Sequence, residues 1–313
     1  MRVLVFGGAG FVGARVCEEL AARGDEVTTF DHVKRDDAPW PQIVASIDER
    51  TDVRAAIRSA RPERIVNLAY LVGPPAEQSP AAAIQVNVLG SALLLEEAAA
   101  AKVARVVYAS SIAVYGTRPE RFGDRDVIES DGIPALDHAN SYGATKSLAE
   151  YFAIAERART GLETCGIRLS IVVGPGRERG FTAWISQIIA ASREGQPATV
   201  PVSPEFPMSL ISIDDAAAAI VAAIRHDGPL RPVYNSGGSD VTAANVVSAL
   251  GAGDLVRWAP NPEGERAASY VHRISHAVIK HDLGFVPMPI SQYLSAQRDG
   301  PAKAGHEEPA TPG

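Results

Sequence analysis

A tyrosine and a lysine four residues apart, Tyr142 and Lys146, are the side chains whose spacing most directly suggests chemistry. Helical positions four apart share a face, so the ammonium is expected one turn from the phenol. A nearby positive charge lowers the pKa of a phenol from about 10, and such a phenol can exchange a proton with an alcohol near neutral pH. Ser111 offers a hydroxyl for the same oxygen. We therefore expect Ser111, Tyr142 and Lys146 to be catalytic in hydride transfer at a carbon–oxygen centre.

A glycine-rich turn, Gly7-Gly8-Ala9-Gly10-Phe11-Val12-Gly13, lies between the first expected strand and a helix. Gly7 allows the tight turn, Gly10 lets the backbone approach a pyrophosphate, and Gly13 lets the helix pack closely on the sheet. The N-terminus of the helix, at Phe11 and Val12, offers N–H groups and a positive dipole end to phosphate. The turn therefore predicts a dinucleotide site, and a merely structural glycine turn is the alternative.

The residues after the second expected strand bear on the type of dinucleotide. Asp31 can accept hydrogen bonds from the adenosine ribose, and its charge would repel a 2′-phosphate. Lys34 and Arg35 could hold such a phosphate, although a solvated loop is the preferred interpretation. The sequence therefore favours NAD over NADP. Asp48 could approach the adenine or cap a helix, and both interpretations stay open.

Short β-branched runs alternate with alanine-rich runs through the first half of the chain. Strands are expected at 3–6, 26–30, 42–46, 64–67, 105–109 and 163–173, and helices at 11–23, 52–59, 81–101 and 141–159. This alternation predicts an α/β fold, a Rossmann-type doubly wound parallel sheet with a smaller C-terminal substrate lobe. We expect a Rossmann domain over 1–174, segments near 208–238 returning to it, a substrate lobe over 175–298 and a disordered tail over 299–313.

Composition narrows the class of protein. The 313 residues carry a formal charge of −7 with dispersed basic residues, so no nucleic-acid surface is expected. Cys17 and Cys165 lack metal-ligand spacing and are expected in the core, which suits a reducing cytoplasm, and no metal site is predicted. Neither a signal peptide nor an uncharged apolar run of about 18 residues is found, so we expect no membrane segment.

Several motifs in the correct order resemble one known family. They are Gly7-Gly8-Ala9-Gly10-Phe11-Val12-Gly13, Asn67-Leu68-Ala69, Asn87-Val88-Leu89-Gly90, Ser110-Ser111, Tyr142-Gly143-Ala144-Thr145-Lys146, Arg168-Leu169, Gly174-Pro175-Gly176 and Asp214-Asp215-Ala216. Together they resemble the extended short-chain dehydrogenase/reductases, and within these the NAD-dependent epimerase/dehydratase family typified by UDP-galactose 4-epimerase. The resemblance runs from residue 1 to about 238.

The resemblance implies roles for the matching positions. Tyr142 would be the general acid/base, Lys146 would hold the nicotinamide ribose and lower the Tyr142 pKa, and Ser111 would bind the reacting oxygen. Other cofactor-binding positions implied by the motifs are Ser46, Ile47, Leu68, Ala69, Asn87 and Pro175. Arg177 and Arg179 could meet a substrate anion, with a solvated loop as an equal alternative. The helices expected at 81–101 and 141–159 would form a homodimer interface.

The resemblance leaves the reaction open. We expect a nucleotide-sugar 4-epimerase acting on a UDP-hexose or hexuronate, and the alternative is an NAD(P)-dependent dehydrogenase of a small hydroxy acid or ketone. A dehydratase is disfavoured because Ile112 and Ala113 stand where that reaction needs acidic groups. A non-catalytic NAD(P)-binding protein is a remote alternative. For a sugar nucleotide, the segment 204–208 offers no cation, and Arg231 and Arg257 are the candidate diphosphate ligands.

Overall fold

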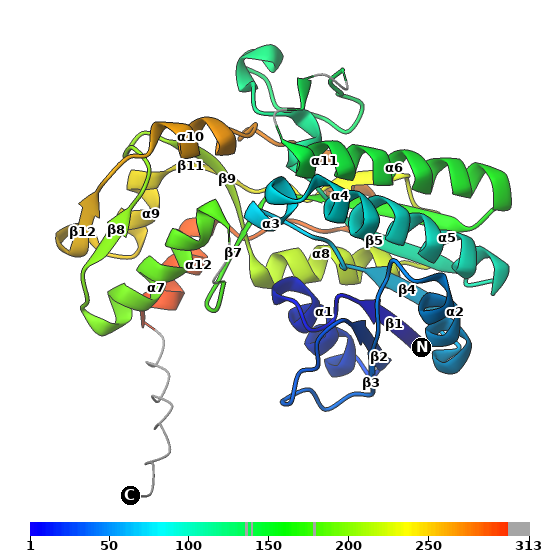
Figure 1. The fold of residues 1–313 in the computed structure, drawn as a ribbon. Helices are drawn as coiled ribbons and strands as arrows, with labels where there is room; N and C mark the ends of the chain where they lie inside the picture. Colours follow the sequence, from blue (N-terminus) through cyan, green and yellow to red (C-terminus); the bar gives the residue numbers. More distant parts are fainter. Residues whose placement is uncertain (135–136, 139, 178–179, 300–313) are drawn as a thin grey trace, which may run out of the picture.

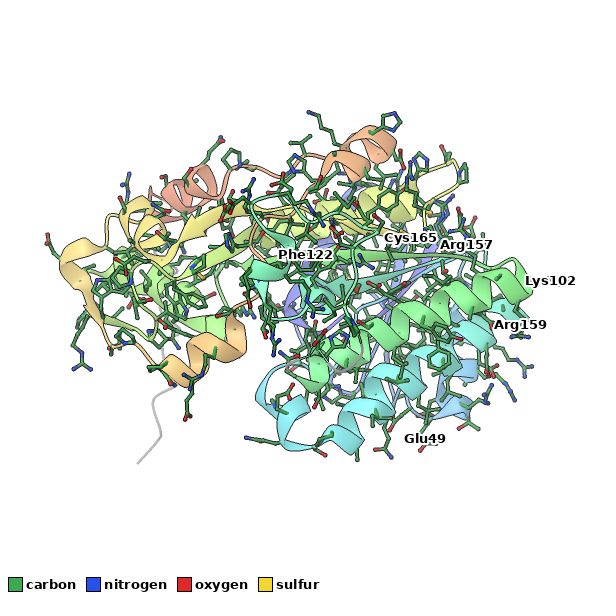
Figure 2. The ribbon with its side chains drawn as sticks, turned by 90° about the horizontal axis from the view of Figure 1, so that it is seen from above. Glu49, Lys102, Phe122, Arg157, Arg159 and Cys165 are labelled. Carbon is green, nitrogen blue, oxygen red and sulfur yellow. The ribbon has the colours of Figure 1, made fainter. Side chains whose placement is uncertain are left out.

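The computed structural model describes residues 1–134, 137–138, 140–177 and 180–299, and shows a large sheet-containing lobe beside a smaller one (Figure 1). Arg179 and residues 300–313 of the expected tail lie outside the described residues. Figure 2 shows the molecule from above, with Arg157 and Arg159 at the end of one long helix that is farther from the small lobe.

Within the described residues, seven parallel strands form the main sheet, in the order β10-β6-β5-β4-β1-β2-β3. The strands are β1 (Arg2–Phe6), β2 (Glu26–Asp31), β3 (Gln42–Val44), β4 (Arg64–Asn67), β5 (Arg105–Ser111), β6 (Glu163–Leu169) and β10 (Val233–Asn235). The order reverses direction beside β1, between β4 and β2. This confirms the predicted Rossmann-type sheet and places its topological switch point at the glycine turn.

Helices cover both faces of the sheet. On one face α1 (Phe11–Ala22) packs against α8 (Ile213–Arg225), and on the other lie α2 (Arg50–Ala60), α5 (Ser91–Ala100) and α6 (Ser141–Thr160). Successive strand residues point to opposite faces, so Val66 joins the core with α1 and α8, whereas Ile65 joins the core with α2 and α5. Cys17 and Cys165 are free and buried in the first of these cores, as predicted.

The helix expected at 81–101 has an irregular first half. It consists of α4 (Pro80–Ala83), a π-helical turn η1 (Ile84–Gly90) and α5. The wider turn brings the Asn87 side chain inward, where it bonds both backbone groups of Leu71, and sequence periodicity does not reveal such a turn. Within the described ranges, the run Pro80–Ala100 is long and apolar enough to cross a membrane, but 56% of its most apolar window is buried inside the protein. Packing between layers accounts for the buried part of this run, whereas Ile84 and Leu89 are exposed.

The strand expected at 163–173 is divided at Ser170, whose N–H donates to Ser236 Oγ at 3.1 Å instead of continuing the ladder. The second part, β7 (Ile171–Val173), leaves the main sheet and pairs with β9 (Pro207–Ser212), which also pairs with β11 (Ser239–Thr242). The chain then returns to the large lobe through α8 and β10.

The other elements of the described residues are short helices, helical turns and strands. They are α3 (Pro74–Gln78), η2 (Ile112–Tyr115), η3 (Pro119–Phe122), η5 (Phe181–Ala183), α7 (Trp184–Glu194), β8 (Ala198–Val200), α9 (Ala243–Ala249), η6 (Gly253–Leu255), β12 (Val256–Trp258), α10 (Pro262–Ala268), α11 (Ala277–Leu283) and α12 (Ile290–Asp299).

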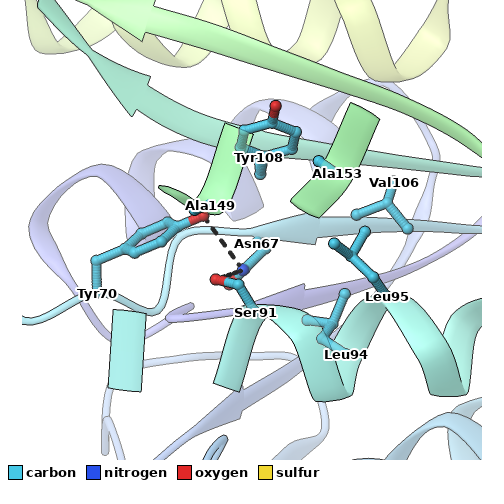
Figure 3. A pocket seen from close by; sticks show the side chains of 9 residues that line it. All are labelled: Asn67, Tyr70, Ser91, Leu94, Leu95, Val106, Tyr108, Ala149 and Ala153. Carbon is cyan, nitrogen blue, oxygen red and sulfur yellow. Dashed lines mark hydrogen bonds between the residues drawn. The ribbon is translucent and has the colours of Figure 1, made fainter. Parts of the chain in front are cut away.

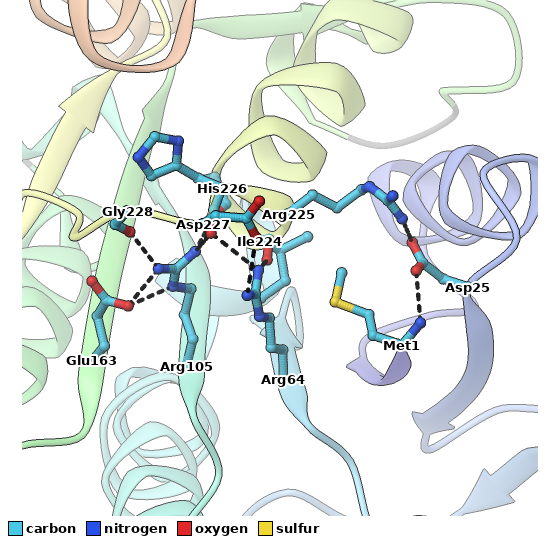
Figure 4. Close-up of polar contacts among 11 residues, drawn as sticks. Met1, Asp25, Arg64, Arg105, Glu163, Ile224, Arg225, His226, Asp227 and Gly228 are labelled. Carbon is cyan, nitrogen blue, oxygen red and sulfur yellow. Dashed lines mark hydrogen bonds and ion pairs between the residues drawn. The ribbon is translucent and has the colours of Figure 1, made fainter.

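Two arginines at the start of neighbouring strands hold the end of α8 (Figure 4). Arg64 and Arg105 donate to backbone carbonyls at and just beyond the C-terminus of this helix, including those of Ile224 and His226. Guanidinium groups satisfy carbonyls that a helix end leaves without partners, and they complement its dipole. This clamp lies at the amino ends of the strands, so it stabilises the fold at the edge opposite the predicted site.

Candidate active site

The carboxyl ends of the parallel strands bring most predicted site residues to one edge. Phe6 at the end of β1 is in register with Asn67 at the end of β4, and Asn67 is in register with Tyr108 on β5. The glycine turn, Leu68-Ala69 and Ser111 therefore follow or end adjacent strands at the same edge of the sheet. In open α/β sheets this edge, at the switch point, forms the ligand crevice.

The glycine turn has a shape that larger residues would not permit. Gly7 has a φ of 77°, and a Cβ there would lie 2.5 Å from the Leu68 carbonyl carbon. A Cβ on Gly13 would overlap the Gly7 carbonyl, whereas Gly10 at the surface begins α1. The Ala9 N–H donates to Asp31 Oδ2 at 3.0 Å, so the acidic residue at the end of β2 is tied to the turn. This close cradle at a helix N-terminus fits the pyrophosphate and ribose of a dinucleotide.

The other predicted cofactor residues differ in their surroundings. Leu68 and Ala69 pack their backbone against Gly7, and Pro175 is partly buried after β7. Lys34 is exposed, 3.9 Å from Asp36. Ser46 and Ile47 lie in the loop after β3. The Ser46 hydroxyl donates to Asp48, and the Ile47 side chain is buried against Gly90. Ile47 is therefore part of the core and the Ser46 hydroxyl is bound within its own loop, while contacts of either residue with the cofactor stay a prediction.

The first turn of α6 is fixed from both sides. Asn140 Oδ1 accepts from Gly143 N at 2.8 Å, and the Glu77 carboxylate accepts from the N–H groups of Ser141 and Tyr142 at 3.0 and 3.1 Å. A Cβ on Gly143 would lie 2.7 Å from the Ala113 carbonyl oxygen, so this glycine lets α6 approach the turn after β5. Backbone N–H groups that a helix start leaves without partners are satisfied in this way.

These contacts bring the three predicted catalytic residues together. The Ser111 side chain hydrogen bonds to the Tyr142 phenol, and Ser111 Oγ also accepts from Ala113 N at 3.2 Å. Lys146 is buried, and its Nζ lies 5.6 Å from the centroid of the Tyr142 ring while donating to the Ala109 carbonyl at 2.7 Å. A serine hydroxyl, a phenol and an ammonium thus surround the end of β5.

Burial and neighbouring groups act on the pKa of both Tyr142 and Lys146, and the lowering of the Tyr142 pKa by Lys146 stays a prediction. Burial raises the pKa of Tyr142, while the Ser111 hydrogen bond and the Arg177 guanidinium oppose that rise. Burial lowers the pKa of Lys146 well below its ordinary range, and the Glu150 carboxylate opposes that change. In this structure Arg177 is therefore the cation that favours the Tyr142 phenolate.

Asn87 connects the catalytic helix to the loop after β4. The Asn87 side chain is fully buried. Its Oδ1 accepts from Leu71 N at 2.7 Å, and its Nδ2 donates to the Leu71 carbonyl and to Thr145 Oγ1, both at 3.0 Å. Thr145 in turn donates to the Tyr142 carbonyl at 2.9 Å. Asn87 therefore supports the loop and helix that carry the candidate site.

Behind Lys146 a buried ion pair joins α6 to the sheet. Arg168 on β6 donates to both carboxylate oxygens of Glu150, at 2.9 and 2.8 Å, and to the Tyr115 hydroxyl at 2.7 Å. Tyr115 is 1% exposed and also donates to Asn235 on β10. Tyr115 is thus a core residue.

Arg177 and Tyr270 lie near the catalytic tyrosine but come from distant parts of the sequence. Arg177 is partly buried and donates to the Val172 carbonyl, and its charge acts on the phenols of Tyr142 and Tyr270. Asn140 Nδ2 donates to the Tyr270 hydroxyl at 3.0 Å. Sequence reasoning included Arg177 but missed Tyr270, because a single tyrosine in a segment without clear periodicity carries no signal.

Comparisons with known proteins agree with this geometry. A sequence model of the NAD dependent epimerase/dehydratase family matches residues 3–237. D-erythronate dehydrogenase of Cupriavidus necator is 31% identical over 270 residues, which cover 80% of this chain and 81% of that protein. The UDP-glucose 4-epimerase of Thermus thermophilus in complex with NAD is 27% identical, with a TM-score of 0.81 over 96% of this chain and 98% of that one.

A third comparison shows the shared fold. An L-threonine dehydrogenase of Cupriavidus necator has a TM-score of 0.85 at 19% identity, over 95% of this chain and 99% of that one. The chain belongs to the NAD-dependent epimerase/dehydratase family. It is an enzyme of the extended short-chain dehydrogenase/reductase type, as its relatives are named dehydrogenases and epimerases.

Proposed function

We propose that this enzyme is an NAD-dependent dehydrogenase of a small secondary hydroxy acid. The observation that carries the proposal is the Arg177 guanidinium, which is partly buried beside β7, donates to the Val172 carbonyl and favours the Tyr142 phenolate through its charge. An arginine in such a place can pair with a carboxylate in two parallel hydrogen bonds. A substrate that carries a carboxylate near its hydroxyl could meet Arg177 and Tyr142 at the same time, and a small hydroxy acid has both groups.

Two further observations support a small substrate over a sugar nucleotide. Arg231 lies before β10, at the amino ends of the strands, and pairs with Asp282 at 2.7 Å, so it is far from a diphosphate at the carboxyl edge. Arg257 is an exposed residue of β12 in the small lobe. The relative that is 31% identical is named for D-erythronate, a small hydroxy acid. These points favour the alternative over the sugar-nucleotide reaction expected from the sequence.

In the proposed mechanism the residues act on one carbon–oxygen group. The glycine turn, Asp31 and Lys146 would hold NAD, which when bound would accept the hydride from the substrate carbon. Tyr142 takes the hydroxyl proton as the carbonyl forms, and Ser111 donates a hydrogen bond to the same oxygen. Arg177 holds the carboxylate and keeps the Tyr142 pKa from rising further. The products are a keto acid, NADH and a proton.

A nucleotide-sugar 4-epimerase is the second candidate, because the Thermus enzyme shares 27% identity over nearly the whole chain. Both reactions begin with the same hydride removal, but an epimerase returns the hydride to its substrate. The two candidates therefore differ in whether the cofactor changes after a full turnover.

The test is to denature the purified protein, identify any released nucleotide, and then offer NAD with a panel of small hydroxy acids. Net NADH formation with one of them, and a rise in KM for that acid in an Arg177→Gln variant, would support the proposal. Stoichiometric bound NAD, interconversion of UDP-hexoses and no NADH formation would overturn it in favour of the epimerase. The Arg231→Gln variant is the matched control, since its guanidinium lies at the opposite edge of the sheet.

We further propose NAD instead of NADP, a cytoplasmic location and a homodimer. Asp31, bound to the glycine turn, would repel a 2′-phosphate, which supports NAD. The free, buried cysteines suit a reducing compartment. Exposed apolar side chains on η1 and α6 support the dimer, with its interface on that face.

A further inference from the structure

The ring of Tyr70 lies against the ammonium of Lys146. Lys146 Nζ is 2.7 Å from the centroid of the Tyr70 ring and donates to the Ala109 carbonyl at 2.7 Å, and Lys146 is 2% exposed. A buried ammonium needs partners for its charge, and an aromatic face attracts a cation most strongly where water is excluded. The ring and the carbonyl together set the direction of the ammonium.

Tyr70 is itself held at its hydroxyl end. Figure 3 shows the phenol directed toward Asn67 and Ser91, beside a small cavity of about 10 Å³. Asn67 Nδ2 donates to the Tyr70 oxygen at 3.4 Å, and Ser91 forms a side-chain hydrogen bond with it. Tyr70 directly follows Leu68-Ala69, so the strand end that lines the glycine turn also places this ring.

We propose that Tyr70 is a positioning residue for Lys146, whose ring face holds the ammonium against the Ala109 carbonyl in the orientation needed to bind the cofactor ribose. An ammonium has three N–H groups, and the carbonyl and the ring engage two of them, which leaves one for a ribose hydroxyl. The proposal rests on the cofactor-binding role proposed above for Lys146. The hydroxyl of Tyr70 serves only to anchor the ring.

Several charged or titratable groups face Lys146 from the elements packed around it. They are Tyr142 and Glu150 on α6, Arg168 on β6 through its ion pair with Glu150, and Tyr70 after β4. Glu150 stabilises the ammonium, and Arg168 remains bound to Glu150 whether or not Tyr70 is changed. Removing the ring face should therefore take one stabilising contact from the charged form of Lys146 and lower its pKa.

The test is the affinity for NADH measured across alkaline pH, which needs no substrate. If the Lys146 ammonium binds the ribose, NADH affinity falls as pH rises through the Lys146 pKa. In Tyr70→Leu the midpoint of that fall should move to lower pH by about one unit. Tyr70→Phe keeps the ring face, so its midpoint should stay with the wild type.

A control variant and a second probe complete the test. Tyr108→Leu removes a ring that lines the same small cavity, so its midpoint should not move. If Tyr70→Leu does not fold, 3,4,5-trifluorophenylalanine at position 70 keeps the ring shape but weakens its negative face, and the midpoint should again fall. An unchanged midpoint, or an equal shift in Tyr108→Leu, would overturn the role of Tyr70 alone. NADH affinity in the wild type that is independent of pH would overturn the role of Lys146 as well.

Discussion

At the scale of single residues, the chemistry depends on how Tyr142 is kept ready to lose its proton. Burial opposes the phenolate, and the Ser111 hydrogen bond and the Arg177 charge favour it. The balance between a group's burial and its neighbours is the usual way in which an enzyme sets a working pKa. Each of these neighbours can be changed separately.

Replacing Arg177 should move the pH dependence of alcohol oxidation. Oxidation needs the phenolate, so kcat/KM rises as pH rises through the Tyr142 pKa of the free enzyme. Arg177→Gln removes a positive charge, the Tyr142 pKa rises, and the acidic limb of the kcat/KM profile should move to higher pH. Arg177→Lys keeps the charge and should keep the limb. A limb at the same pH in both variants would show that Arg177 acts on binding alone.

Tyr142→Phe should reduce kcat by about 10²- to 10⁴-fold, the usual contribution of a general acid or base, without weakening NADH binding. The change removes only the hydroxyl and keeps the ring beside Ser111. Steady-state kinetics and NADH titration measure the two effects. Tyr151→Phe, an exposed tyrosine of the same helix, is the control. Full turnover by Tyr142→Phe would exclude this residue as the base.

At the scale of elements, the start of α8 shows that backbone conformation decides which side chain caps a helix. Ser212 is the N-cap, with its Oγ accepting from Asp215 N at 3.0 Å. Asp214 instead lies in the first turn and pairs with Arg15 on α1 at 2.6 Å. Ser212 has the extended backbone that a cap requires, and Asp214 is already helical.

Ser212→Ala should therefore lower the free energy of unfolding by about 1 kcal/mol, and urea denaturation measures it. Asp214→Ala should lower the free energy of unfolding by a smaller amount. Because the Asp214–Arg15 ion pair is partly exposed, this loss should become smaller at high salt. The loss in Ser212→Ala should not depend on salt. Equal losses with equal salt dependence would contradict the assignment of the cap.

How far the sequence could predict this protein also differs among its elements. The parallel sheet and the trio Ser111, Tyr142 and Lys146 follow local patterns: β-branched runs, a glycine turn and an i, i+4 pair. The π-helical turn at Asn87 and the break at Ser170 depend on bonds to distant residues, which periodicity does not reveal. The same holds for Tyr70 and Tyr270, because each gains its role only when separate loops meet at Lys146 or Tyr142.

At the scale of the whole molecule, different parts of the chain contribute different groups to the proposed site. The large lobe supplies the glycine turn and the catalytic trio, all at the carboxyl edge of one sheet. The loop after β7 and the segment before α11 bring Arg177 and Tyr270 to the same place. Under the proposed function, hydride chemistry would belong to the large lobe, and Arg177 and Tyr270 would contribute to substrate selection from segments whose sequences follow no general pattern.

The outer face of α6 and η1 gives the last prediction, which concerns assembly. This apolar face comprises Ile84, Leu89, Leu148, Tyr151 and Phe152, all of them 37–64% exposed. The elements that carry these residues, η1 and α6, pack against each other, and Figure 1 shows α5, the continuation of η1, beside α6. Contiguous exposed apolar surface of this kind marks an interaction site, and a second copy of the chain could cover it with the same face.

Sedimentation velocity should therefore show a dimer for the wild type and a monomer for the double variant Leu148→Glu, Tyr151→Glu. Two carboxylates on each copy would have to be buried without partners, and that cost exceeds what a small apolar interface provides. Val286→Glu changes an equally exposed apolar residue away from α6 and should remain a dimer. Because α6 also carries Tyr142 and Lys146, the dimer would hold the catalytic helix from outside, as the Glu150–Arg168 pair holds it from within. A wild-type monomer, or a dimer that survives the double variant, would place any interface elsewhere.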